Sequence, residues 1–156
     1  MVATLAANLG KGLAAGLIGT IAMTISSTTE MHLRGRPGSA APATAASKVL
    51  GIATFTSAEA EARFSSLVHW AYGTGWGAVR GLVGTVLSPR TADVAHVGAV
   101  YGTEHLMLPA LEVAPPATEW GANEIAIDGL HHLVYAAATS LAYRWLDARA
   151  PFPSAP

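Results

Sequence analysis

The sequence has 156 residues, a length typical of one domain. Hydrophobic residues make up 51% of the chain and charged residues 12%, which is about half the share of an average soluble domain. The net charge of −1 argues against a nucleic-acid-binding surface, and the absence of cysteine excludes disulfides, zinc-thiolate sites and iron–sulfur clusters. The mean hydropathy of +0.38 and the 16 glycines favour a membrane protein.

The first predicted helix spans about Leu9 to Met31. Its uncharged stretch, Gly12 to Thr29, is near the lower length limit for crossing a membrane. Lys11 before this stretch resembles the start of a signal peptide, but no small-residue cleavage site follows, so we expect a retained membrane helix. Gly12 and Gly16 form a GxxxG pattern, which allows another helix to approach closely.

A short interfacial helix can form in the first loop, between Pro42 and Thr54, around the segment ASKVLGI. A capping-box pattern follows, in which Thr56 accepts from a backbone N–H and Glu59 reaches back. The second predicted helix therefore starts near Ser57 and extends to Leu87.

The second predicted helix carries a polar and aromatic face beside a line of glycines. The glycines recur every four residues and form a smooth track for a neighbouring backbone: Gly73, Gly77 and Gly81. The polar and aromatic face consists of His69, Tyr72, Trp76 and Arg80. We expect Arg80 to reach lipid headgroups with its long stem or to pair with a carboxylate such as Glu104.

Two proline breaks separate the remaining helices. After Ser88-Pro89, Thr91 can cap a third helix over Ala92 to Leu111. After Pro115-Pro116, Thr118 can cap a fourth helix over Glu119 to Asp147.

These elements predict an all-α, four-helix transmembrane bundle, with residues 1–148 as one domain and residues 149–156 as a flexible tail. A soluble all-α bundle is the alternative. Against it, the second helix carries only His69 and Arg80 between Ser65 and Leu87, whereas a soluble surface helix has a broad polar side.

The membrane orientation stays open at this point. Four crossings would place the first loop and the C-terminus on opposite sides of the membrane. Because both regions are basic, the positive-inside rule does not select one orientation. The basic residues are Arg34, Arg36, Lys48 and Arg63 in the first loop, and Arg144 and Arg149 near the C-terminus.

The fourth predicted helix places its polar side chains on one stripe when each residue advances by about 100°. That stripe consists of Glu124, Asp128, His131, His132 and Tyr135. The opposite side is apolar, with Leu130, Leu133, Val134, Ala137 and Leu141. A charged group at the bilayer centre costs about 3 kcal/mol, so we expect the stripe to face the bundle interior and to meet Glu104 or His105 of the third helix.

This inward cluster has several interpretations. Carboxylate and imidazole groups from separate helices can bind iron, manganese or zinc, and the candidate ligands are Glu104, His105, Glu124, Asp128 and His132. The same groups could instead relay protons or form a purely structural hydrogen-bonded network. We expect His96 to be structural, and Glu30, beside Arg34 and Arg36, to lie at the membrane interface.

Two further functions stay open. Haem could bind between facing helices, with His69 and either His131 or His132 as axial ligands. Alternatively, the chain could be a non-catalytic accessory subunit whose glycine faces bind a second copy or a larger membrane complex. An ordinary hydrolase, kinase or dehydrogenase is disfavoured, since the chain has no Gly-x-Ser-x-Gly, P-loop or His-Glu-x-x-His motif.

The motifs resemble the YagU-like family of small bacterial inner-membrane proteins, whose biochemical activity is not established. The shared features are a Pro- and Arg-containing stretch after the first helix, Glu30 to Pro37, then HWAYGTGWG and LMLPALEVAPP, and finally a Glu-x3-Asp-x3-His-Leu-Val pattern at Glu124, Asp128 and His132. The resemblance implies a multi-pass helical protein of the bacterial inner membrane with a shared polar ladder, and it implies no mechanism.

Overall fold

The computed structural model describes residues 2–149, and all of the regular structure in this range is helical. The predicted all-α class is therefore confirmed, and a short helix lies in the first loop as expected. Of the tail predicted for residues 149–156, all but Arg149 lies outside the described residues. The elements are α1 (Val2–Arg34), α2 (Ala41–Leu50), α3 (Ala58–Val83), α4 (Pro89–Ala110), a 3-10 turn (Ala117–Glu119) and α5 (Ala122–Ala148).

The starts of α3 and α4 differ from the predicted caps. Ser57, rather than Thr56, caps α3, and its Oγ accepts from the backbone N–H of Ala60 at 3.2 Å. Ser88 caps α4 by accepting from the backbone N–H of Thr91 at 3.4 Å. The cap precedes Pro89 because proline fits the first helical position, where its missing N–H costs nothing.

The start of α5 also lies later than expected. Thr118 is part of the 3-10 turn and does not cap a helix. Gly121 occupies the N-cap position of α5 and provides no side-chain bond to the first turn. The Pro115-Pro116 pair thus leads into a separate short turn before the helix begins.

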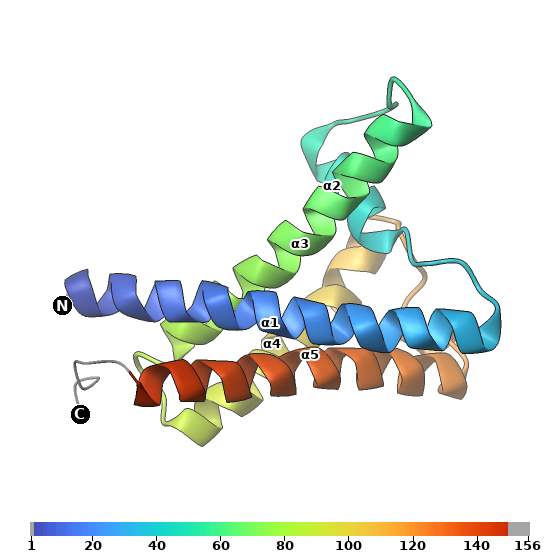
Figure 1. Cartoon of the computed structure of the whole chain (residues 1–156). Helices are drawn as coiled ribbons and strands as arrows, with labels where there is room; N and C mark the ends of the chain where they lie inside the picture. The colour runs from blue at the N-terminus through green and yellow to red at the C-terminus, as the bar shows by residue number, and fades with distance from the viewer. Residues whose placement is uncertain (1, 150–156) are drawn as a thin grey trace.

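The four long helices form two crossing layers (Figure 1). α1 and α5 lie side by side and run in opposite directions. α3 crosses α1 diagonally, and α4 packs against both α5 and α3. The short α2 packs on α3 where α3 projects beyond the α1–α5 pair.

Glycines bring the backbones of α1 and α3 into direct contact. A Cβ atom at Gly77 would overlap the carbonyl of Gly12 and the Cα of Gly16, and one at Gly16 would lie 2.7 Å from the Cα of Gly77. A Cβ at Gly81 would overlap the carbonyl of Asn8. The predicted contact through the glycine faces is confirmed. The two faces thus cover each other within this chain.

The bundle buries polar as well as apolar side chains and exposes many large apolar ones. Its buried polar side chains are Asn8, Thr20, Arg80, His96, His131, Thr139 and Ser140. Large apolar side chains are exposed on all four long helices, among them Leu13, Leu17, Ile18, Ile21 and Ile25 of α1, and Leu130, Leu133, Leu141 and Trp145 of α5. The apolar side predicted for the fourth helix thus faces outward, as expected.

Within residues 2–149, α1 is the one helix that is both long and apolar enough to cross a membrane. Its position near the N-terminus and its many exposed apolar side chains match the first predicted segment.

Replacing Gly77 with Leu should destabilise the protein by at least the roughly 1–3 kcal/mol typical of overpacking. The new side chain would collide with backbone atoms of α1, which cannot move aside as a flexible side chain can. Gly75→Leu is the matched control: Gly75 is exposed on the same helix, and a Cβ there would meet nothing within 4 Å. Thermal unfolding of the two purified variants measures the difference. Equal unfolding temperatures would contradict the proposed packing role of Gly77.

Candidate functional site

Three polar side chains converge between α4 and α5. Glu104 comes from α4, and Asp128 and His132 lie one turn apart on α5. One potential ligand atom from each of the three residues lies within 4.8 Å of the other two. All three side chains are partly buried. We call these residues the α4–α5 cluster.

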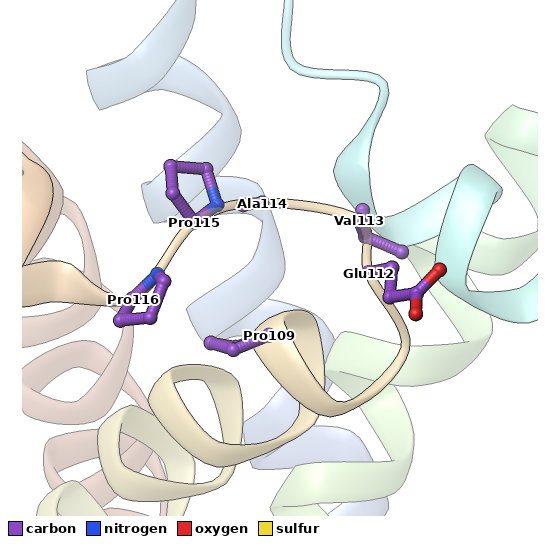
Figure 2. A pocket seen from close by; sticks show the side chains of 6 residues that line it. All are labelled: Pro109, Glu112, Val113, Ala114, Pro115 and Pro116. Carbon is purple, nitrogen blue, oxygen red and sulfur yellow. The ribbon is translucent and has the colours of Figure 1, made fainter.

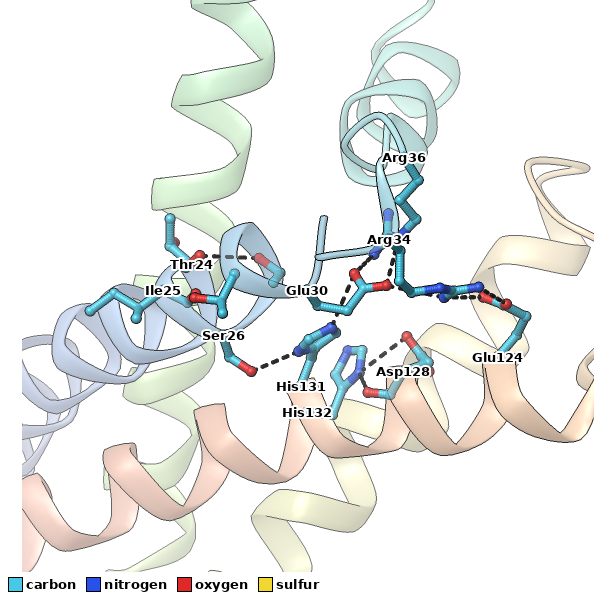
Figure 3. A network of polar contacts seen from close by, with 12 residues as sticks. Thr24, Ile25, Ser26, Glu30, Arg34, Arg36, Glu124, Asp128, His131 and His132 are labelled. Carbon is cyan, nitrogen blue, oxygen red and sulfur yellow. Dashed lines mark hydrogen bonds and ion pairs between the residues drawn. The ribbon is translucent and has the colours of Figure 1, made fainter. Parts of the chain in front are cut away.

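The ring of His132 is oriented by its own helix. Its Nδ1 lies 3.0 Å from the backbone carbonyl of Asp128 (Figure 3). A carbonyl can only accept, so Nδ1 carries the proton, and Nε2 of the neutral ring has a free lone pair. Such an outer hydrogen bond is what fixes the tautomer of metal-binding histidines.

The lone pair of His132 Nε2 lies close to a carboxylate oxygen. Nε2 is 2.9 Å from Oε2 of Glu104, the distance of an ion pair if the ring carries a second proton. Two lone pairs at this distance repel each other unless a positive charge lies between or beside them. That charge can be a second ring proton or a bound cation.

The carboxylates of the cluster have few partners of their own. Glu104 Oε2 and Asp128 Oδ2 are buried and form no hydrogen bond. Within residues 2–149 no lysine or arginine pairs with either carboxylate, and their ion-pair contacts are to His132 alone. A buried carboxylate without a cation or donor is strongly unfavourable, so the cluster attracts positive charge.

His105 does not join the α4–α5 cluster, although it is adjacent to Glu104. Its ring packs edge-on against Tyr101 at a centroid distance of 4.2 Å and against Trp120 at 5.4 Å. Tyr101 also contacts the His132 ring at 5.4 Å. His105 therefore belongs to an aromatic wall beside the cluster rather than to the predicted ligand set.

Glu124 also lies outside the cluster, so the predicted three-residue ladder is interrupted. Its carboxylate binds Arg34 of α1 through two contacts, at 2.5 and 3.2 Å, and about half of the side chain is exposed (Figure 3). The cause is the antiparallel packing of α5 on α1, which brings the first turn of α5 to the end of α1. There a side chain one turn before Asp128 meets Arg34 instead of α4.

Glu30 is the centre of this ionic network. It accepts from Arg34 at 3.0 Å and from Arg36 through two nitrogens (Figure 3). The hydrogen bonds to Glu30 raise the pKa of the Arg36 guanidinium above its ordinary value. The network joins the end of α1 to the start of α5 and gives Glu30 and Glu124 structural partners.

His131 and His69 contact α1 from two different sides. His131 Nδ1 bonds to Ser26 Oγ at 2.8 Å (Figure 3), and His69 Nε2 bonds to Thr24 Oγ1 at 2.8 Å. Thr24 and Ser26 lie about 200° apart around α1. Because α1 separates the two imidazoles, they do not face each other across a space for haem.

Arg80 pairs with Asp93 rather than with Glu104. Arg80 is only 1% exposed, and its Nε and Nη2 donate to Asp93 Oδ1 at 3.1 and 2.8 Å. Arg144 approaches the second oxygen, Oδ2, at 3.3 Å, and the Arg80 guanidinium lies over the Tyr143 ring at 4.5 Å. Asp93 was not among the predicted site residues.

The remaining polar candidates have structural partners. Tyr135 donates to the carbonyl of Gly73 at 2.5 Å and so ties α5 to α3. His96 is fully buried, and its Nε2 lies 3.1 Å from the carbonyl of Trp76. The structural role expected of His96 is consistent with this bond.

A hollow at the C-terminal end of α4 is lined mainly by proline and small apolar residues. It is lined by the loop that follows the helix, and Glu112 is its single charged lining residue (Figure 2). The carbonyls of Leu111 and Glu112 accept from Lys48 of α2. This contact docks α2 against the end of α4.

No protein-family model, curated protein or solved structure matches the chain. The YagU-like resemblance therefore stays an expectation.

Asp93→Asn should lower the free energy of unfolding by about 3 kcal/mol, because it leaves the Arg80 guanidinium buried without a counter-charge. Glu124→Gln serves as the comparison. It removes the same charge from a half-exposed pair, where solvent screens the interaction, so we expect little change. Chemical denaturation of both variants provides the measurement. A loss no larger for Asp93→Asn than for Glu124→Gln would contradict the role given to the buried pair.

Proposed function

We propose that this protein is a multi-pass membrane protein that binds a divalent metal ion between α4 and α5. The ligands would be Glu104, Asp128 and His132. In line with the YagU-like resemblance, we place it in the bacterial inner membrane.

The exposed apolar side chains and the buried polar groups support the membrane part of this proposal. Soluble monomers rarely expose large continuous apolar surfaces, yet Ile25 of α1 and Leu141 of α5 are 64% and 62% exposed. The buried side includes polar and charged groups such as Arg80 and His96. Polar groups of membrane helices are expected to turn inward in this way.

The contact between His132 Nε2 and Glu104 Oε2 is the observation that best supports the proposed metal site. Two ligand atoms that each lie about 2.1 Å from one ion are about 3.0 Å apart at a 90° angle and about 3.4 Å apart in a tetrahedron, and these two atoms are 2.9 Å apart. Asp128 adds a second carboxylate, and its carbonyl holds the ring in the tautomer that leaves Nε2 free. A cation would compensate both carboxylates at once.

The donor set suits manganese, iron or zinc. Nitrogen and oxygen ligands are compatible with each of these ions, and no thiolate is present to select a softer metal. Three protein ligands would leave at least one coordination position for water or a substrate, as in catalytic metal sites. The ring next to the site, Tyr101, would limit access from one side.

A proton is the second candidate for the positive charge. A doubly protonated His132 would neutralise part of the charge of Glu104 and Asp128, and the cluster would then hold and release protons. Nitrogen-15 NMR of His132 separates the two candidates, because a metal-bound ring keeps one proton whereas an imidazolium has two.

The membrane placement predicts that the full-length protein sediments with membranes and stays there after alkaline carbonate extraction. Apolar helix faces, rather than ionic contacts, would hold it in the bilayer, so salt and high pH should not release it. Recovery as a soluble monomer without detergent would disprove the membrane placement. Such a result would not decide whether the protein binds a metal, which the next experiment tests.

The metal site predicts a stoichiometric divalent ion in protein purified in detergent and supplied with manganese, iron or zinc. Loss of a residue that only orients a ligand lowers metal affinity by roughly 10–100-fold. Asp128→Asn and His132→Ala each remove a proposed direct ligand, so each should lower the metal affinity by more than that. Elemental analysis and a metal titration give the measurement, and an absorption spectrum tests for haem.

Glu124→Gln is the matched control for the metal experiment. It lies one turn before Asp128 on the same helix and removes the same charge, but its carboxylate binds Arg34. The control should keep the metal. Absence of metal from the wild-type protein under all three supplies, or equal loss in the control, would reject the site and favour the proton or a purely structural, accessory role.

A further inference from the structure

A second feature of the α4–α5 pair is a shallow groove on its outer side. It has a volume of about 330 Å³, near the lower end of the roughly 300–1,000 Å³ typical of ligand sites. Its lining shares no residue with the α4–α5 cluster. The groove therefore needs its own interpretation.

The lining changes from apolar to polar along the groove. One end is formed by Val97 of α4 and Leu133 of α5, and Ala137 continues this apolar surface. The other end is formed by Asp93 and Arg144. Since the helices are antiparallel neighbours, both change polarity in the same direction, and the groove as a whole is amphiphilic.

A buried hydroxyl lies between the two ends. Ser140 lines the groove, is only 4% exposed, and its Oγ has no hydrogen-bond partner. It precedes Arg144 by four residues on the same face of α5, a rise of about 6 Å. An unpartnered hydroxyl is thus buried beneath the point where the apolar wall ends.

The polar end carries a net positive charge. Asp93 is shared by two guanidinium groups, those of Arg80 and Arg144, so one positive charge is left over. Arg80 is buried, whereas the side chain of Arg144 is 48% exposed. Arg144 has one ion-pair contact among residues 2–149 and keeps further N–H groups for an anion.

We propose that this groove binds an anionic glycerophospholipid. One acyl chain lies along Leu133 and Ala137, an ester carbonyl accepts from Ser140, and the phosphate binds Arg144. The proposal rests on the membrane placement argued above and is independent of the metal. Arg144 lies one turn from the end of α5.

The test is native mass spectrometry of the full-length protein in detergent, titrated with phosphatidylglycerol or phosphatidylcholine of the same acyl chains. The wild type should bind phosphatidylglycerol at least tenfold more tightly. Arg144→Gln should reduce this affinity to the level of phosphatidylcholine. Ala137→Phe should weaken both lipids, because it fills the apolar part of the groove.

Arg149→Gln is the matched control, since Arg149 is an exposed arginine of the same end that stacks on Trp145 and does not line the groove. Equal affinity for the two lipids, equal loss in Arg149→Gln, or competition by inorganic phosphate alone would overturn the proposal. Thermal unfolding of each variant shows that it is folded. Carbonate extraction reports separately on the membrane placement.

Discussion

The backbones of α1 and α3 touch at Gly12, Gly16 and Gly77, and the positions of the other helices depend on this contact. With no side chains between them, the two helices can cross at an angle that larger residues would prevent. α1 uses a further glycine, Gly19, at the edge of the same face, where it meets α5. A Cβ there would overlap Thr139 Oγ1, so α5 also approaches closely. α1 is thus the central element to which α3 and α5 are both attached.

This arrangement leaves α4 in a special position. It does not share the glycine contacts; it packs on α5 through the apolar cluster of Val100, Tyr135 and Ala136, and it makes charged contacts at two levels. At one level Glu104 meets His132 of α5, and at the other Asp93 meets Arg80 of α3 and Arg144 of α5. The first level has an excess of negative charge and the second an excess of positive charge. The two excesses are the basis of the proposed cation site between α4 and α5 and of the proposed lipid site.

Much of the helical architecture could be predicted from local signals. Apolar runs, prolines and glycines with a spacing of four residues locate the long helices and identify the faces of α1 and α3 that pack. The polar stripe of α5 also followed from its helical period, because side chains that share a face in sequence share it in any fold. His131 and Tyr135 of that stripe are buried, whereas Leu130 and Leu133 on the opposite side are exposed.

Local sequence patterns were enough to locate the long helices, the glycine faces and the inward carboxylate–histidine pair of Asp128 and His132. Tertiary structure decided which residues meet. Glu124 belongs to the same stripe but binds Arg34, because α5 begins beside the end of α1. Arg80 binds Asp93 because the turn between α3 and α4 brings the two helices together there. Helical period fixes the direction of a side chain from its own axis, whereas its partner depends on how far each helix extends along its neighbour, which local sequence does not encode.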